Sequence, residues 1–180
     1  MPGRIDETIP FRPLRIAIAT ISDSRTLEQD RSGPVLIDRL REAGHELAAR
    51  VLVADDVQAI ASQFSTWIDD PAIEIVISTG GTGVTGRDVT PEALAQVIEK
   101  RIDGFGEIFR MISYQKIGTS TIQSRADAGV AKGTYLFVLP GSPGACRDAW
   151  DEILLSQLDI RHKPCNFAEL LPRLREHEGR

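Results

Sequence analysis

Four apolar segments of strand length alternate along the chain with stretches in which apolar residues recur at helical spacing. The strand-like segments span residues 14–20, 45–54, 72–79 and 133–142. The helical spacing is clearest after the second segment, where one face collects Val57, Ile60, Ala61, Phe64, Trp67 and Ile68. Strands that alternate with helices predict an α/β fold, in which a parallel or mostly parallel sheet carries helices on both faces.

Capping residues predict where further helices begin. Ser32, Thr90 and Ser142 each stand at the start of a helical pattern with a proline close behind, and such side chains accept hydrogen bonds from the first free N–H groups of a helix. The short segment 128–131 is expected to pair with the last strand across a Lys-Gly turn. The charged segment 161–180 is expected to fray.

Composition limits the partners and the compartment. The chain has 180 residues, of which 42% are hydrophobic and 26% are charged, as in one globular domain. A net charge of -5 disfavours nucleic acid as a partner, because proteins that bind it usually carry a basic excess. No apolar run approaches the roughly 20 residues of a membrane span, and the N-terminus lacks the apolar core of a signal peptide. Cys146 and Cys165 make neither a disulfide framework nor a zinc site. We therefore expect a cytoplasmic protein without a membrane partner.

Small, polar and acidic residues follow each strand-like segment. They are Ser-Asp-Ser at 22–24, Asp55 with Asp56, the glycine-rich loop 80–88, and PGSPG at 140–144. Because the carboxyl ends of parallel strands meet at one edge of a sheet, these groups are expected to form one site. We expect Asp56 to cap the next helix and Asp55 to point into the site, although either aspartate alone is a good cap.

The glycine-rich loop matches two nucleotide-binding patterns, but its context fits neither. Gly81, Gly83 and Gly86 fit the dinucleotide pattern G-x-G-x-x-G, yet the acidic residues about 20 positions later stand in a helical context. Gly81 and Gly86 also have P-loop spacing, but Arg87 and Asp88 follow where lysine and a hydroxyl residue belong. Both of these families are therefore disfavoured.

The loop nevertheless has the groups of an anion site. Glycine lets successive backbone N–H groups approach an anion without a Cβ clash, and threonine adds hydroxyl groups. The residues concerned are Thr79, Gly80, Gly81, Thr82, Gly83 and Thr85. The Asp88 carboxylate would repel a phosphate here unless Mg²⁺ lay between them, and Asp55 could supply a second carboxylate. The loop thus predicts a site for phosphate and a metal.

The same loop and three further segments resemble the MoaB/MogA family of molybdenum cofactor biosynthesis proteins. These segments read STGGTGVTGRDVTPEA (78–93), GFGEIFRM (104–111), SR (124–125) and LPGSPGACRDAW (139–150). The ending HKPCNF is more similar to the MoaB branch. The resemblance covers residues 14–168 and leaves 1–13 as an N-terminal extension and 169–180 as a charged tail. It implies a three-layer α/β/α sandwich.

The activity that the resemblance implies is the adenylylation of molybdopterin. Mg-ATP would transfer AMP to the terminal phosphate of molybdopterin, pyrophosphate would leave, and a downstream molybdenum-inserting enzyme would take the product. The resemblance gives the catalytic and metal-binding roles to Asp55 and Asp88. It gives substrate binding to Thr79, Gly80, Gly81, Thr82, Gly83, Ser124, Arg125, Gly141 and Ser142. It further implies a homotrimer or a homohexamer.

Two other functions remain open from the sequence. One is a molybdopterin-binding oligomer without catalysis, which would act as a carrier, scaffold or regulator, and the other is a generic nucleotide-binding module. Asp88 could also be a turn residue that pairs with Arg87, and Ser124 and Arg125 carry no motif of their own. The presence of Asp88 in the loop favours the enzyme.

Overall fold

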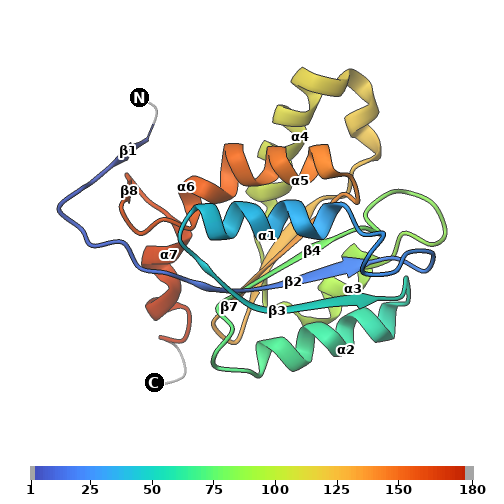
Figure 1. The fold of residues 1–180 in the computed structure, drawn as a ribbon, viewed down its shortest axis with the longest axis horizontal. Coiled ribbons are helices and arrows are strands. Elements are labelled where there is room, and N and C mark those ends of the chain that lie inside the picture. The colour runs from blue at the N-terminus through green and yellow to red at the C-terminus, as the bar shows by residue number, and fades with distance from the viewer. Residues whose placement is uncertain (1–2, 177–180) are drawn as a thin grey trace.

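One six-stranded sheet forms the centre of the computed structural model, which describes residues 3–176 (Figure 1). The strand order is β3-β2-β4-β7-β6-β5. The strands are β2 (Arg15–Ile21), β3 (Glu46–Val53), β4 (Ile75–Thr79), β5 (Lys100–Arg101), β6 (Asp127–Ala131) and β7 (Thr134–Leu139). The pairs β2–β3, β2–β4 and β4–β7 are parallel, whereas β6 is antiparallel to both β7 and β5. The mostly parallel sheet and the pairing of 128–131 with the last strand are confirmed.

Helices cover both faces of the sheet, so the three-layer α/β/α arrangement is also confirmed. Helices α1 (Ser32–Glu42), α4 (Asp103–Ile117) and α5 (Pro143–Ala149) lie on one face, and α2 (Val57–Ile68) and α3 (Thr90–Val97) lie on the other (Figure 1). None of the helices within residues 3–176 is long and apolar enough to cross a membrane.

Each face of the sheet has its own hydrophobic core, because neighbouring side chains of a strand point to opposite faces. In β2, Ile16 and Ile18 join the core under α1, α4 and α5, whereas Ala17 and Ala19 join the core under α2 and α3. All four are fully buried. The two tryptophans follow the same division, with Trp150 in the first core and Trp67 in the second.

Short elements complete the chain around this frame. They are β1 (Arg4–Ile5), the 3-10 helix η1 (Gly118–Gln123), the π-helical turn η2 (Trp150–Leu154), α6 (Leu155–Gln157), β8 (His162–Lys163), α7 (Phe167–Leu170) and the 3-10 helix η3 (Leu171–Arg173). Strand β1 pairs antiparallel with β8, which joins the N-terminal segment to the segment that precedes α7.

The expectation that the C-terminal segment frays is wrong as far as residue 176. Ala168 is buried, and Phe167, Leu171 and Leu174 pack against the first core. These apolar residues recur at helical spacing among the charges, and their burial holds the segment in place. Residues 177–180 lie outside the described part of the chain.

Of the three predicted caps, only Ser142 is confirmed, since its hydroxyl oxygen accepts the N–H of Ala145 at 3.1 Å. The prediction is wrong for Ser32, because the carboxylate of Asp30 accepts the N–H groups of Ser32 and Gly33, each at 3.0 Å. It is also wrong for Thr90, whose hydroxyl group donates to the carbonyl oxygen of Gly80 at 2.8 Å. A carboxylate that accepts two N–H groups at once satisfies more of the free helix donors than one hydroxyl group does.

His45 is a buried titratable group with a large pKa shift. Its ring is 5% exposed and lies between Phe11 and Trp150, with ring centroids 5.3 and 6.2 Å away. Its Nδ1 atom accepts the N–H of Leu14 at 3.2 Å, so the neutral ring carries its proton on Nε2. Burial lowers the pKa of His45 to about 4, and the charge of Asp159 opposes this only in part.

This shift predicts a loss of stability in mild acid. The unfolded chain binds a proton at His45 below about pH 6.5, whereas the folded chain does so only near pH 4. The free energy of unfolding is therefore fully retained above pH 6.5 and falls as the pH drops through this window, by about 2 kcal/mol at pH 5. Urea unfolding at pH 7.5 and at pH 5.0 measures this loss in the free energy of unfolding, with His45→Gln as the comparison. The difference in the free energy of unfolding between wild type and variant should be smaller at pH 5.0 by the loss calculated for His45. An equal difference at both pH values would contradict the lowered pKa of His45.

Candidate functional site

The loops that follow β2, β3, β4 and β7 meet at the carboxyl edge of the sheet. The chain passes from β2 to β3 on one side of β2 and then places β4 on its other side. In open α/β sheets such a reversal opens a crevice between the two strand ends, where ligands bind. The glycine-rich loop lies at this switch point, as the sequence predicts.

The glycine-rich loop is folded tightly against the end of β2. Gly80 has a φ of +110°, and a Cβ built on it would lie 2.3 Å from the carbonyl oxygen of Ile21. Gly81 has a φ of +63°, and its Cβ would lie 2.4 Å from the Thr90 hydroxyl oxygen. The N–H of Thr90 donates to the carbonyl oxygen of Gly81 at 3.0 Å, which closes the loop onto α3. Only glycine fits these two positions.

Two N–H groups at the bend of this loop are free. Among residues 3–176, no acceptor takes the backbone N–H of Gly81 or Thr82, whereas the N–H of Gly80 donates to Leu139 in β7 at 3.0 Å. Backbone N–H groups are strong donors that are almost always paired when they are buried. Both residues line an open pocket, so a bound anion would supply the missing acceptors.

Asp88 is held inside the loop by Thr85. Its Oδ2 atom accepts the hydroxyl group of Thr85 at 2.6 Å and the backbone N–H of Thr85 at 2.9 Å. The hydroxyl hydrogen bond is the largest cause that lowers the pKa of Asp88 below its ordinary value. The side chain therefore stays a carboxylate, and Thr85 rather than Arg87 is its partner.

Arg125 reaches across to the same loop. Its guanidinium donates to the carbonyl oxygens of Gly83 at 2.6 Å and Asp88 at 2.5 Å, and it forms an ion pair with Glu92. Its backbone N–H donates to the carbonyl oxygen of Thr82 at 2.9 Å. The side chain of Arg125 thus stabilises the glycine-rich loop, whereas the resemblance implies that it binds the substrate.

The two adjacent aspartates make different contacts, and the predicted cap at Asp56 is confirmed. Asp56 caps α2, since its Oδ1 atom accepts the N–H of Ala59 at 2.8 Å. Asp55 is half-buried at the end of β3 and forms reciprocal hydrogen bonds with Asp23, which follows β2. Burial raises the pKa of Asp55 above its ordinary value. The hydrogen bond from Asp23 opposes this rise, whereas the charges of Asp23 and Asp88 reinforce it.

Asp23 was not singled out by sequence reasoning. The segment 22–24 was expected at this edge, but no residue in it was assigned a role. Its position directly after β2, one strand away from Asp55, was the signal that could have identified it.

An open pocket of about 410 Å³ brings together most of the predicted substrate-binding residues. Those that line it are Gly81, Thr82, Gly83, Ser124, Gly141 and Ser142, with Asp88 at the same wall. Gly141 packs against Gly80, because a Cβ on Gly141 would lie 3.2 Å from the Cα atom of Gly80. This contact joins the loop after β7 to the glycine-rich loop.

Thr79 and Gly80 lie beneath this pocket and do not line it. The hydroxyl group of Thr79 is buried, donates to the carbonyl oxygen of Pro140 at 2.9 Å and lies 3.2 Å from the Cys146 sulfur. Thr79 therefore contacts the loop after β7, and Gly80 contacts β2.

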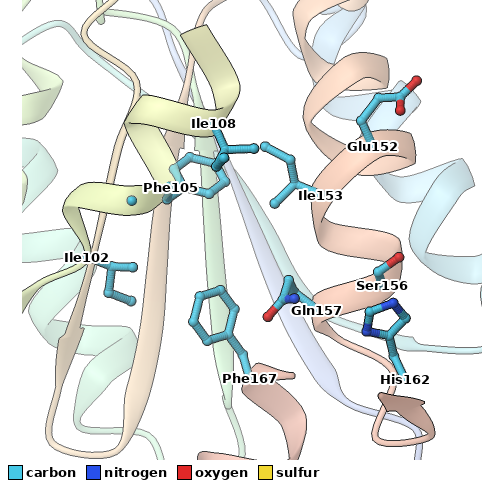
Figure 2. Close-up of a pocket in the computed structure, with 10 residues that line it drawn as sticks. Ile102, Phe105, Ile108, Glu152, Ile153, Ser156, Gln157, His162 and Phe167 are labelled. Carbon is cyan, nitrogen blue, oxygen red and sulfur yellow. The ribbon is translucent and has the colours of Figure 1, made fainter. Parts of the chain in front are cut away.

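A second pocket, of about 480 Å³, lies between α4 and the segment 152–157 (Figure 2). Figure 2 shows apolar side chains gathered around it, namely Ile102, Phe105, Ile108, Ile153 and Phe167. The carboxylate of Glu152 points away from them. None of the predicted site residues lines this pocket, and its apolar wall does not suit a phosphate group.

Carboxylate oxygen atoms at the switch point are suitable ligands for a hard cation such as Mg²⁺. The Oδ1 atom of Asp55 accepts no hydrogen bond among residues 3–176, and it lies 3.1 Å from the position of a Cβ on Gly81. No group of three or more His, Cys, Asp or Glu side chains within the described residues could hold a metal ion. A cation here would therefore need phosphate oxygens and water as further ligands. Mg²⁺ is usually bound in this way, through one or two carboxylates and substrate phosphates.

This fold and site define an α/β protein whose ligand site lies at the switch point of a mostly parallel sheet. A family model described as "Probable molybdopterin binding domain" matches residues 17–160. The chain therefore belongs to the MoaB/MogA family of molybdenum cofactor biosynthesis proteins.

Relatives with known names agree with this membership. The chain is 50% identical over 157 residues to Molybdenum cofactor biosynthesis protein B of Escherichia coli (strain K12), a match that covers 87% of this chain and 92% of that relative. A crystal structure of a molybdenum cofactor biosynthesis protein B has a TM-score of 0.83 at 38% identity, over 92% of this chain and 98% of the other. The tungsten cofactor synthesizing protein MoaB from Pyrococcus furiosus has a TM-score of 0.71 at 28% identity, over 92% and 97%.

The packing of the loop predicts that Gly80→Ala destabilises the fold. A methyl group would meet the backbone of β2 at a φ that alanine rarely adopts, and the expected loss in the free energy of unfolding is about 2 kcal/mol or more. Gly86→Ala is the matched control, because a Cβ there meets nothing within 4 Å and the expected change is within about 0.5 kcal/mol. Urea unfolding compares the two variants. Equal stabilities would contradict the close contact between Gly80 and Ile21.

Proposed function

We propose that this chain works in molybdenum cofactor biosynthesis as a molybdopterin adenylyltransferase. It would transfer AMP from Mg-ATP to the terminal phosphate of molybdopterin and release pyrophosphate. The observation that carries the proposal is the pairing of free N–H groups at Gly81 and Thr82 with two carboxylates, Asp55 and Asp88, at one switch point. Family membership supports molybdopterin as the acceptor.

The loop geometry supports a phosphate ligand in the pocket. The N–H groups of Gly81 and Thr82 are fixed before a ligand arrives, because Gly80, Thr90 and Arg125 hold the loop from three sides. Donors that are already oriented stabilise developing negative charge without a cost of reorganisation. A pocket of about 410 Å³ lies within the usual range for small-molecule sites.

The two carboxylates support a metal-dependent reaction. Asp55 and Asp88 would hold Mg²⁺, which when bound supplies charge neutralisation between the two anionic substrates. Asp88 is kept ionised by Thr85, and the free Oδ1 atom of Asp55 faces the loop. Both side chains are therefore available as oxygen ligands.

The chemistry needs no general base from the chain. An oxygen atom of the pterin phosphate forms a bond to the α-phosphorus of ATP, the bond from that phosphorus to the bridging oxygen breaks, and pyrophosphate leaves with the electron pair. The attacking phosphate is already ionised at neutral pH. The protein has to bind the two substrates, align them and offset their charge, which is the usual division of labour in phosphoryl transfer.

Pyrophosphate release tests the proposal. The purified chain with molybdopterin, ATP and Mg²⁺ should release pyrophosphate, and Asp88→Ala should lower the rate roughly 100-fold or more, because several kcal/mol of charge stabilisation depend on the metal. Asp70→Ala is a control, since Asp70 accepts one backbone N–H in a turn after α2 and lies outside the site. If the chain binds molybdopterin but releases no pyrophosphate, the adenylyltransferase proposal is wrong and a non-catalytic carrier is favoured.

We also propose that the chain forms a homo-oligomer. Helix α4 exposes four large apolar side chains at three-residue intervals: Ile108 (46%), Met111 (64%), Tyr114 (54%) and Ile117 (56%). Several large apolar side chains exposed along one helix favour a contact with another molecule.

Light scattering at micromolar concentration checks this second proposal. The wild type should have the mass of a trimer or a hexamer, and Met111→Glu should lower that mass, because the buried contact would then hold an unpaired charge. Asp38→Asn, at an exposed position of helix α1 and away from α4, should leave the mass unchanged. A monomeric wild type would rule the proposal out.

A further inference from the structure

Asp23 and Asp55 form a closed pair across the ends of two strands. The backbone N–H of Asp23 donates to Oδ2 of Asp55 at 2.9 Å, and the backbone N–H of Asp55 donates to Oδ1 of Asp23 at 2.9 Å. Each side chain therefore accepts from the backbone of the other residue. Two aspartates joined in this way fix both loops relative to one another.

The pair continues the parallel ladder between β2 and β3 beyond the strand ends. The last backbone hydrogen bond of that ladder runs from the N–H of Ser22 to the carbonyl oxygen of Val53, at 2.9 Å. Beyond it no backbone–backbone hydrogen bond joins the two loops within the described residues, and the carboxylate of Asp23 accepts the N–H of Asp55. The side chain of Asp23 thus extends the contact between the two segments past the end of β3.

The consequence for Asp55 is that only one carboxylate oxygen remains free. Its Oδ2 atom is occupied by the N–H of Asp23, which fixes the rotation of the side chain. Its Oδ1 atom then faces the glycine-rich loop, 3.1 Å from the Cβ position of Gly81. The Asp23 carboxylate holds the backbone of Asp55, whereas the N–H group that holds the Asp55 side chain belongs to the backbone of residue 23 and is present whatever side chain stands there.

We propose that Asp23 is a positioning residue whose carboxylate fixes the backbone of Asp55 and thereby keeps the Oδ1 atom of Asp55 beside the phosphate site. The role rests on the proposed function, because it matters for activity only if Asp55 binds the metal. Asp23 acts through Asp55, because the one hydrogen bond that its carboxylate accepts among residues 3–176 comes from the backbone N–H of Asp55. The described residues also hold no cluster of three such side chains that could bind a metal.

Two substitutions at residue 23 separate hydrogen bonding from charge. Asp23→Asn keeps an oxygen acceptor for the N–H of Asp55 but removes the charge, whereas Asp23→Ala removes both. Asp70→Ala is the matched control, because the Asp70 side chain also accepts a backbone N–H, that of Ala72 at 2.8 Å, but in a turn away from the site. Asp23 is exposed, so all three chains should fold.

The first readout is hydrogen exchange at the Asp55 amide, which does not depend on any activity. Loss of its acceptor in Asp23→Ala should raise the exchange rate about tenfold, and Asp23→Asn and Asp70→Ala should stay near wild type. Faster exchange in Asp23→Asn as well, or unchanged exchange in Asp23→Ala, would overturn the positioning role.

The second readout is the Mg²⁺ dependence of pyrophosphate release. Asp23→Ala should raise the Mg²⁺ concentration for half-maximal rate and lower kcat about tenfold, with Asp23→Asn restoring both to within about threefold of wild type. An equal loss in the two variants would mean that the charge of Asp23 matters and would overturn the proposal. If the wild type releases no pyrophosphate, the proposed function fails, and the exchange measurement still decides whether Asp23 holds Asp55.

Discussion

A direct backbone contact between the ends of β2 and β4 is the constraint on which the site depends. The carbonyl oxygen of Ile21 occupies the space that a Cβ on Gly80 would need, so the loop after β4 lies against the last residue of β2. At that contact the chain after β4 lies close to the end of β2, and the next two residues, Gly81 and Thr82, line the pocket. Thr90 and Arg125 then close the loop from the sides of α3 and η1. A rigid set of free N–H groups results.

The two carboxylates at this point differ in how they are held. Asp88 is bound by Thr85 within its own loop, and that hydrogen bond lowers its pKa. Asp55 is partly buried at the end of another strand, and burial raises its pKa. The Asp88 carboxylate is thus fixed to the glycine-rich loop, whereas Asp55 is fixed to the end of the sheet through Asp23. A ligand bound between them would bridge the loop and the sheet.

The fold could be predicted from the sequence because its signals are local and repeated. The strand-like segments and the helical face of α2 each bury apolar residues with a clear period. Strands β3, β4 and β7 lie within the predicted segments, and β2 extends one residue beyond its segment, to Ile21. Predictions of helix caps from local sequence were wrong where another polar group offered or took the hydrogen bond. Asp30 replaced Ser32 as a helix cap, and Thr90 bonds to Gly80 instead of capping α3. The many charged residues of the C-terminal segment predict that it frays, but Phe167 and Leu171 in this segment pack against the core.

The sequence by itself determined the α/β class, the glycine-rich loop and the presence of Asp55 and Asp88 at one edge of the sheet. Each of these follows from residue type and spacing along the chain. Only the tertiary structure decided which of the predicted side chains bind the backbone of neighbouring loops. Arg125 and Thr79 are turned toward backbone carbonyl oxygens, and Asp23 is joined to Asp55. These contacts join residues 32 to 61 positions apart, and their geometry exists only once the sheet has brought the strand ends together.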